Sequence, residues 1–336
     1  MLKLTRNAKR KGKQKKSSTK RKVAITLSVI GLLIIGLIGG GAAYGLSMLG
    51  KVNKVEVNEN NLGIDKEIDD KLSQYDGITN IALFGIDAVD GKTGRSDAIM
   101  IATIDEKHKK LKLTSIMRDS YVNIPGHKMD KINHAYAFGG HELALKTLNE
   151  NFDLNIKDFA TVDFSSLPKI IDSVGGIDLD IRSDEIQYIN NYINELNSLN
   201  GTSAANINTP GVHHVNGTQA LAYCRIRYTA GGDGERTQRQ RIVLNKLFEK
   251  FTQLSPTKYP SILGDLMPMV TTNLSSSEML SLATTVASLG GSGLEQERFP
   301  KDNYSKGEMI NGVYYLTFDK ETTVKQLHDY IFEDIK

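Results

Sequence analysis

A stretch of 27 residues without a charged side chain, from Val23 to Leu49, most limits what this chain can fold into. As a helix it exceeds the roughly 20 residues that cross the hydrocarbon core of a bilayer. A core helix of a soluble protein would show a polar face, whereas the polar side chains here are only Thr26, Ser28, Tyr44 and Ser47. A cleaved signal peptide, the alternative, has an apolar region of only about 7–15 residues. The stretch therefore predicts a transmembrane helix over residues 23–49.

Charge differs on the two sides of this stretch. Residues 1–22 hold eleven Lys and Arg residues and no acid, whereas the remaining 31 basic residues face 39 acids, a net charge of −8. The basic flank of a membrane helix stays in the cytoplasm. We therefore expect a basic cytoplasmic tail at 1–22, a single-pass anchor in the cell membrane and an extracellular C-terminal part. The overall charge of +3 describes neither part, so it does not indicate binding of nucleic acid.

The extracellular part predicts one α/β or α+β domain. Residues 50–77 are polar and acidic and predict a stalk, and residues 78–336 predict the folded domain. Strands are predicted by apolar runs at 78–87, 98–104, 111–117, 159–163, 177–181, 294–299 and 312–318. Helices are predicted over 131–151 with a break at Gly139–Gly140, and over 217–223, 234–254, 259–272, 275–289 and from Glu321. Strands that alternate with helices favour a mixed sheet sandwiched by helices. The single cysteine, Cys224, excludes an internal disulfide, which is typical of a Gram-positive surface protein.

Arginine is unevenly placed in this domain. It has nine arginines against 22 lysines, and six of the nine fall in three short segments, at Arg95, at Arg118, and at Arg225, Arg227, Arg236 and Arg239. The planar guanidinium group offers forked donors that match phosphate oxygens. In an extended segment Arg225 and Arg227 would share a face. On the next helix Arg236, Arg239 and Gln240 would share one side. The clustering predicts a phosphate-binding site, and salt bridges within an acidic domain are the alternative.

Two acids accompany the first of these arginines. Asp87 ends the first predicted strand and Asp97 begins the second, so one glycine-rich loop separates them and both can reach one cation. Mg²⁺ typically binds one or two carboxylates together with substrate phosphate oxygens. The pair therefore predicts a Mg²⁺ site, which Mn²⁺ could also fill, and a turn or helix cap is the alternative role of each Asp. The chain has no P-loop pattern and no HExxH or CxxC pair, which disfavours nucleotide and zinc sites.

Seven segments follow one another along the chain: FGID, GRSDAIMIATID, LTSIMRDSYVNIPG, KINHAYAFGG, IDSVGGIDLDI, GTQALAYCRIRY and GDGERTQRQ. This ordered set, over residues 79–250, resembles the LytR–CpsA–Psr (LCP) family. The resemblance implies an α/β domain that holds a polyprenyl pyrophosphate lipid with its tail in an apolar tunnel. It also implies Mg²⁺-dependent transfer of a lipid-linked glycopolymer, such as wall teichoic acid or capsular polysaccharide, onto the peptidoglycan of Gram-positive bacteria.

Family roles carry over to the matching positions. The resemblance implies that Asp87 and Asp97 are the metal-associated acids, and with Arg118 they are the expected catalytic residues. The pyrophosphate-binding set comprises Arg95, Arg118, Arg225, Arg227, Arg236 and Gln240, to which the helical spacing adds Arg239. The chain departs from the family at Met117, where Pro is common, and at Gly234–Glu235, where an aromatic–Gly pair is usual.

The expected reaction is phosphoryl transfer to a sugar hydroxyl of peptidoglycan, with Asp87 or Asp97 as the base. Two alternatives remain: hydrolysis of the same lipid pyrophosphate, and a membrane-bound regulator that attenuates transcription of envelope genes. A 22-residue tail without a helix-turn-helix pattern disfavours sequence-specific DNA binding. Anionic lipid head groups are the expected partners of that tail.

Other polar residues give weaker signals. His134 could act as a general base or pack on a helix. His213 and His214 fall in a polar connection and predict a surface position. Cys224 lies among apolar residues and predicts a small core side chain rather than a nucleophile.

Overall fold

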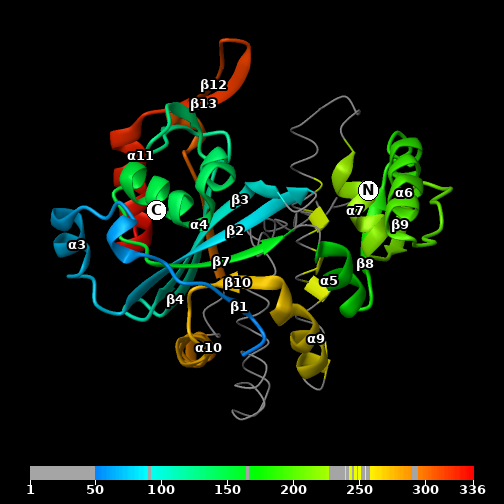
Figure 1. The fold of residues 1–336 in the computed structure, drawn as a ribbon, viewed down its shortest axis with the longest axis horizontal. Coiled ribbons are helices and arrows are strands. Elements are labelled where there is room, and N and C mark those ends of the chain that lie inside the picture. The colour runs from blue at the N-terminus through cyan, green and yellow to red at the C-terminus, as the bar shows by residue number, and fades with distance from the viewer. Residues whose placement is uncertain are drawn as a thin grey trace, which may run out of the picture.

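The computed structural model describes residues 50–89, 92–163, 166–226, 258–289 and 294–336, with residues 239, 242, 243, 246, 247, 249, 250 and 254 between them. A mixed sheet of seven strands forms the centre of this part of the chain (Figure 1). Its order is β1 (Asn53–Lys54), β10 (Val270–Thr272), β7 (Asp158–Asp163), β2 (Ile78–Val89), β3 (Lys92–Asp105), β4 (Lys110–Ile116) and β11 (Leu294–Phe299). The pairs β2–β7, β4–β11 and β1–β10 are parallel, and the other pairs are antiparallel.

Both faces of the sheet are buried, because successive side chains of β2 enter two different cores. Ile81 and Leu83 belong to one apolar cluster, and Ala82 and Phe84 belong to the other. The sequence of a strand that is buried on both faces is a nearly continuous run of apolar residues, without alternation of polar and apolar side chains. This explains why the run Ile78–Asp87 predicted a strand correctly.

Helices cover both faces. One face packs against α3 (Lys66–Leu72), α4 (His134–Phe152) and α11 (Lys320–Phe332). The other core receives side chains from α5 (Leu167–Ser173), α6 (Ile186–Asn200), α7 (Gly217–Arg225), α9 (Tyr259–Leu266) and α10 (Ser276–Leu289). Within the described residues, short 3-10 turns occupy Glu59–Asn61, Met267–Met269 and Asp302–Tyr304. Helix α4 leaves helical geometry at Gly139 and Gly140, as predicted, and the positive φ of 64° at Gly140 suits glycine.

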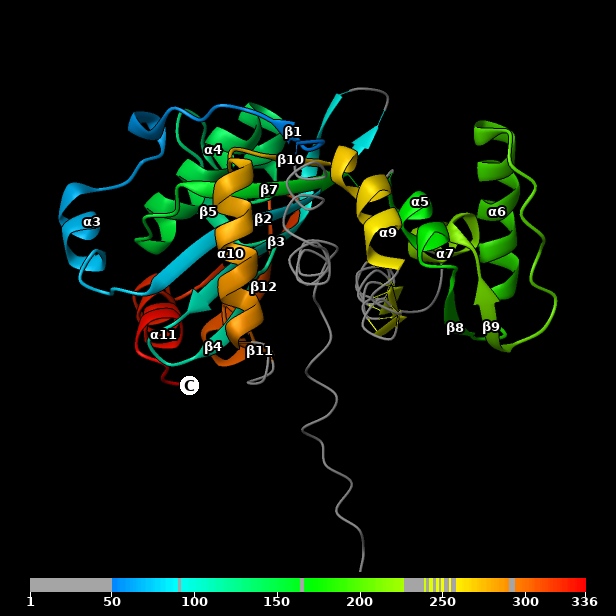
Figure 2. The same cartoon turned by 90° about the horizontal axis from the view of Figure 1, so that it is seen from below.

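Three small two-stranded sheets lie outside the central sheet. They are β5 (Tyr121–Asn123) with β6 (Met129–Lys131), β8 (Ile177–Ile181) with β9 (Gly211–Val215), and β12 (Ser305–Ile310) with β13 (Val313–Phe318). Helices α6 and α7 and the β8–β9 sheet lie together beside one end of the central sheet, away from α11, as Figure 2 shows from below.

Most of the predicted elements are confirmed, but the stalk prediction for residues 50–77 is wrong. Strand β1 pairs with β10, and Leu62 and Leu72 are 0% and 4% exposed. Both leucines belong to the core that also contains side chains of α4, and Ile64 and Ile68 between them pack against the same core. The segment is therefore part of the domain.

The predicted anchor, residues 23–49, and the basic tail lie outside the described residues. From Gly50 onward, none of the helices that the structure describes is long and apolar enough to cross a bilayer.

Candidate active site

A bulge in the β2–β3 pair positions Asp97. Gly85 pairs with Ala98 and Ile86 pairs with Ser96, so Asp97 is the extra residue on β3 at this bulge. Bulges bend a strand and redirect a side chain, and they are frequent next to active sites. The same distortion leaves Ser96 fully buried, where its backbone N–H donates to the carbonyl of Asn133 (3.3 Å). The bulge therefore turns Asp97 toward the segments that follow β4 and β6.

Arg118 and Asn133 bind the Asp97 carboxylate from these two segments. Arg118 Nη1 lies 3.0 Å from Asp97 Oδ2, and the two side chains are 11% and 5% exposed. Asn133 Nδ2 donates to Asp97 Oδ1 at 3.1 Å. The backbone N–H of Asn133 in turn donates to the carbonyl of Arg118 at 3.3 Å, which joins the two segments. Three residues distant in the sequence thus form one mostly buried charged centre.

A second acid and a lysine extend this centre. Asp119 Oδ2 lies 3.5 Å from Arg118 Nε, and Asp119 Oδ1 lies 2.8 Å from Lys131 Nζ. The charges therefore alternate from Asp97 through Arg118 and Asp119 to Lys131. Such a row holds the guanidinium group of Arg118 from two sides, which preorganises it for an anionic ligand.

His134 belongs to the same region. It is the first residue of α4, and its Nδ1 lies 2.8 Å from Asp130 Oδ2. Burial of the Asp130 carboxylate opposes ionisation, but hydrogen bonds from His134 and from the backbone N–H of Lys131 outweigh it. The pKa of Asp130 therefore lies below its usual value. Both the general-base and the packing interpretations of His134 stay open.

One buried oxygen of this centre makes no hydrogen bond. Asn133 is 3% exposed, and its Oδ1 has no partner in the part of the chain that the structure describes. An unsatisfied buried acceptor costs about 1–3 kcal/mol. Amide and carboxylate oxygens are the donors that a hard cation such as Mg²⁺ prefers. Asn133 Oδ1 beside the Asp97 carboxylate therefore fits a Mg²⁺ site, although no group of three or more His, Cys, Asp or Glu side chains suited to a metal occurs among the described residues.

Asp87 and Arg95 lie on the same strand pair. Their backbones face each other across β2 and β3, and Arg95 is exposed, two residues before Asp97. The backbone therefore brings Asp87 close to Asp97 in register. The side chain of Asp87 is outside the described part of the structure.

The second arginine segment lies at the end of α7. Arg225 is the last residue of this helix and 41% exposed, and its Nη1 lies 3.6 Å from Glu195 Oε1. The expectation of an extended segment at Arg225 is therefore wrong, because the capping box between Asn216 and Gln219 starts a helix that runs through it. Arg227, Arg236 and Gln240 lie outside the described residues.

Arg239 is used inside the protein. It is 2% exposed, its Nε lies 2.8 Å from Glu185 Oε1, and its Nη1 donates to the carbonyl of Ile226 at 3.0 Å. The ring of Tyr223 lies 5.9 Å from the Arg239 guanidinium. Burial, and to a smaller extent the nearby charge of Glu185, raises the pKa of Tyr223 to about 12. Pyrophosphate binding by Arg239 would require this ion pair to open, so that prediction stays untested.

The remaining weak signals have simple positions. Cys224 is buried, and burial raises the pKa of its thiol to about 12, as expected for a core side chain. His214 is exposed on β9, with Nδ1 2.7 Å from Asp178 Oδ1. The sequence marked Asp119 as an acid that adjoins an arginine segment, but it did not single out Asn133 or Lys131. Asn133 lies within the segment KINHAY, but its hydrogen-bond partner Asp97 is 36 residues away, so the sequence did not show that the two side chains meet.

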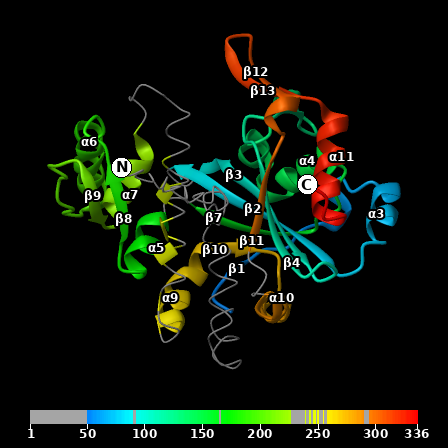
Figure 3. The same ribbon diagram turned by 180° about the vertical axis from the view of Figure 1, so that it is seen from behind.

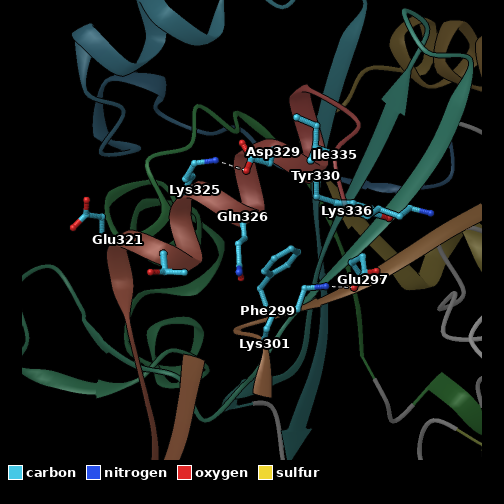
Figure 4. A pocket seen from close by; sticks show the side chains of 11 residues that line it. Glu297, Phe299, Lys301, Glu321, Lys325, Gln326, Asp329, Tyr330, Ile335 and Lys336 are labelled. Carbon is cyan, nitrogen blue, oxygen red and sulfur yellow. Dashed lines mark hydrogen bonds and ion pairs between the residues drawn. The ribbon is translucent and has the colours of Figure 1, made fainter. Parts of the chain in front are cut away.

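A pocket of about 690 Å³ lies elsewhere, between β11 and α11 (Figure 4). Phe299, Tyr330 and Ile335 give it an apolar part, and three acids and three lysines surround them. Four of those charges form two pairs, a Lys325–Asp329 contact of 2.6 Å and a Lys301–Glu297 contact. None of the described residues that line this pocket is an arginine, so it lacks the side chain that marks the candidate site at Arg118.

Several known proteins are similar to this chain in sequence or in structure. The "Regulatory protein MsrR" of Staphylococcus aureus is 31% identical over 263 residues, which cover 77% of this chain and 76% of that protein. The "Polyisoprenyl-teichoic acid--peptidoglycan teichoic acid transferase TagU" of Oceanobacillus iheyensis is 32% identical over 324 residues, covering 92% and 93%. The structure of YwtF (TagT) from Bacillus subtilis "with bound octaprenyl pyrophosphate lipid" aligns with a TM-score of 0.51 at 28% identity, covering 76% of this chain and 91% of that one.

The expected mixed α/β fold is confirmed by this structural likeness. Residues 46–330 also match the sequence model of the LytR_cpsA_psr family. The chain belongs to the LytR–CpsA–Psr family.

Proposed function

We propose that this protein is a phosphotransferase that moves a wall glycopolymer from a polyprenyl pyrophosphate carrier onto peptidoglycan. The observation that carries the proposal is the mostly buried Arg118–Asp97–Asn133 centre at the β3 bulge. Two relatives support it, since TagU is named a teichoic acid transferase and YwtF (TagT) holds octaprenyl pyrophosphate. Wall teichoic acid is the polymer that these names favour, and capsular polysaccharide is the alternative.

The reaction has a simple balance of bonds. A hydroxyl oxygen of a peptidoglycan sugar attacks the phosphorus that bears the polymer, and a new P–O bond forms. The bond from that phosphorus to the bridging oxygen of the pyrophosphate breaks, and the lipid phosphate leaves with the electron pair. The hydroxyl proton passes to a carboxylate. Polymer and peptidoglycan are then joined by a phosphodiester, and polyprenyl phosphate is released.

Arg118 supplies the fixed positive charge for this reaction. Its guanidinium is held on one side by Asp97 and on the other by Asp119, so it need not reorganise when charge develops on the leaving phosphate. Preorganised charge of this kind commonly lowers the barrier of a phosphoryl transfer more than any other single effect. Arg95 and Arg225, which are exposed, would add donors to the pyrophosphate oxygens.

Mg²⁺ is part of the proposal. Asp97, Asn133 Oδ1 and Asp87 would hold the ion, which when bound would place positive charge on the pyrophosphate oxygens. Because one carboxylate cannot easily be both a tight metal ligand and a base, one of Asp87 and Asp97 would take the proton. Chelation of divalent ions should abolish transfer, and Mg²⁺ or Mn²⁺ should restore it.

The lipid would need an apolar surface near this centre. Apolar side chains that remain partly exposed pack against the core that α9 and α10 cover, among them Met279, Leu280 and Leu282 of α10, together with Leu254 and Met269. We propose that the lipid tail lies against this group, with the domain outside the cell and residues 23–49 as a single-pass anchor. A signal-anchor topology places the basic tail at residues 1–22 in the cytoplasm.

The name of MsrR favours a second candidate, a membrane-bound regulator. Removal of residues 1–20 separates the two functions, since a transferase keeps its wall phenotype if it still inserts into the membrane. Hydrolysis of the lipid pyrophosphate is distinguished by its product, which would be free polymer instead of polymer attached to peptidoglycan.

The direct test of the proposal is transfer by the purified protein from a synthetic lipid-linked donor to peptidoglycan fragments. Activity of the wild type, with loss in Arg118→Ala, supports it. Equal activity of the two proteins would refute the role of this centre.

A further inference from the structure

The hairpin of β12 and β13 projects from the body of the molecule. Its two strands form a two-stranded sheet, with one further bridge from Leu316 to Ser120, and a turn at Asn311 and Gly312, with φ of 51° and 79°, joins them. Figures 1 and 3 show the hairpin at one end of the molecule from opposite sides. Strand β1, next to which the proposed anchor joins the domain, lies toward the other end. If residues 23–49 anchor the protein as proposed, the anchor joins the domain on the side away from the hairpin.

The base of the hairpin is fixed to the candidate active site. The backbone N–H of Leu316 donates to the carbonyl of Asp119 at 2.8 Å, directly after Arg118. The ring centroids of Tyr315 and Tyr121 are 4.7 Å apart. Lys131 Nζ lies 5.9 Å from the ring centroid of Tyr314 and 5.8 Å from that of Tyr315. The same lysine pairs with Asp119, so the hairpin is continuous with the charged centre.

The outer part of the hairpin presents apolar side chains to solvent. Met309, Tyr314 and Val313 are 68%, 48% and 43% exposed, and Met309 pairs with Tyr314 across the strands. A Cβ atom at Gly307 would lie 2.7 Å from two atoms of the Tyr314 side chain, so glycine makes room for this ring against β12. The ring contacts β12 at Gly307 and has Lys131 Nζ 5.9 Å from its centroid, and about half of the Tyr314 residue stays exposed. Exposed groups of this kind mark interaction surfaces.

We propose that this distal hairpin surface, formed by Met309, Tyr314 and Lys131, binds a glycan strand of the acceptor. Sugar rings pack their apolar C–H faces on open aromatic rings, and tyrosine presents such a face at little entropic cost. The position of the hairpin opposite β1 favours a wall polymer over a lipid surface. Its connection through Lys131 and Asp119 to Arg118 would hold the bound strand beside the reacting phosphorus. The inference rests on the proposed transferase function, because it names the surface that the acceptor uses.

The test measures co-sedimentation of the full-length protein in detergent with peptidoglycan sacculi stripped of attached polymers. Tyr314→Ala should lower the apparent affinity about tenfold, the effect of removing a central aromatic contact. Tyr314→Phe keeps the ring and should bind as the wild type does. Met309→Ser, on the facing strand, should weaken binding in the same direction. Leu199→Ser is the matched control, because Leu199 is 69% exposed on α6, away from the hairpin.

Unchanged binding by both Tyr314→Ala and Met309→Ser would overturn the inference. The inference would also be overturned if these variants lost binding to anionic vesicles but kept binding to sacculi, since the hairpin would then be a membrane contact. Binding of octaprenyl pyrophosphate, measured on the same proteins, separates this inference from the proposed function. If Arg118→Ala retains the lipid while Tyr314→Ala loses the sacculi, the proposed donor site fails and the hairpin surface stands.

Discussion

Arg118 Nη1 lies 3.0 Å from Asp97 Oδ2, and both side chains are almost removed from solvent. A buried ion pair contributes little net stability compared with apolar residues of similar volume, because both charges must be desolvated. Here the pair lies at a β-bulge, next to an amide oxygen that accepts no hydrogen bond from the described residues. This combination is costly for folding alone, and we therefore expect a ligand to bind these groups.

Asn133 should position Asp97 and hold the cation. Asn133→Ala removes the 3.1 Å hydrogen bond to Asp97 and the unpaired Oδ1, so transfer should fall about 10- to 100-fold. The apparent affinity for Mg²⁺ should fall with it. Asn133→Asp, which restores oxygen donors, should recover part of the Mg²⁺ affinity. A purely structural role predicts equal loss in both variants and an unchanged Mg²⁺ dependence of the remaining activity.

Arg239 should matter for stability more than Arg225 does. Arg239→Ala leaves the buried Glu185 carboxylate without this partner and should lower the free energy of unfolding by about 3 kcal/mol. Arg225→Ala removes an exposed contact of 3.6 Å and should change it by about 0.5 kcal/mol. Denaturant unfolding of the two variants measures the difference. Equal stabilities would show that the Arg239–Glu185 pair does not have this structural role.

A buried pair far from the site predicts a dependence of stability on pH. Asp105 and Lys112 are fully buried, 2.6 Å apart. Burial of Asp105 opposes ionisation, but hydrogen bonds from Lys112 and His108 outweigh it, so the pKa of Asp105 lies below its ordinary value of 3.8. The stabilisation is therefore complete above this ordinary value and is lost as the pH falls through the lower folded-state pKa.

Asp105→Asn should accordingly destabilise the protein by about 3 kcal/mol near neutral pH. The difference from the wild type should narrow in strong acid, where Asp105 is protonated in both states. Asp184→Asn, an exposed acid paired with Arg182, is the control and should have little effect at either pH. If the difference in free energy of unfolding between Asp105→Asn and the wild type did not change with pH, the stabilising role of the Asp105–Lys112 pair would be contradicted.

Cys224 should be inert in the folded protein. Burial raises the pKa of its thiol to about 12, so almost no thiolate exists near pH 8. A thiol reagent should modify it only after unfolding, which a mass measurement with and without denaturant can show. Rapid modification of the folded protein would mean that α7 opens locally.

The sequence predicted those parts of the fold that depend on local patterns. The strand at Ile78–Asp87 followed from its apolar run, and the break in α4 followed from Gly139–Gly140. Strand β12 was not predicted, because its residues are polar or exposed and Gly307 interrupts the pattern. Leu62 was assigned to a stalk because nothing near it in the sequence shows that Asn149 binds its carbonyl.

The candidate site divides in the same way. Asp97 and Arg118 carried signals of their own, as acid and arginine in recognisable segments. Asn133 did not, because its role depends on a bulge and on a contact across 36 residues. For Arg239 the sequence predicted ligand binding from helical spacing, but this spacing cannot reveal that Arg239 is paired with Glu185 in the interior.

The most direct test of the central claim is the rate of polymer transfer from a lipid-linked donor to peptidoglycan by wild type, Arg118→Ala and Asp97→Asn, with folding checked by circular dichroism. We predict folded variants whose transfer rate is lower by about 100-fold or more. Transfer at the wild-type rate in both folded variants would contradict a catalytic role of the Arg118–Asp97 pair.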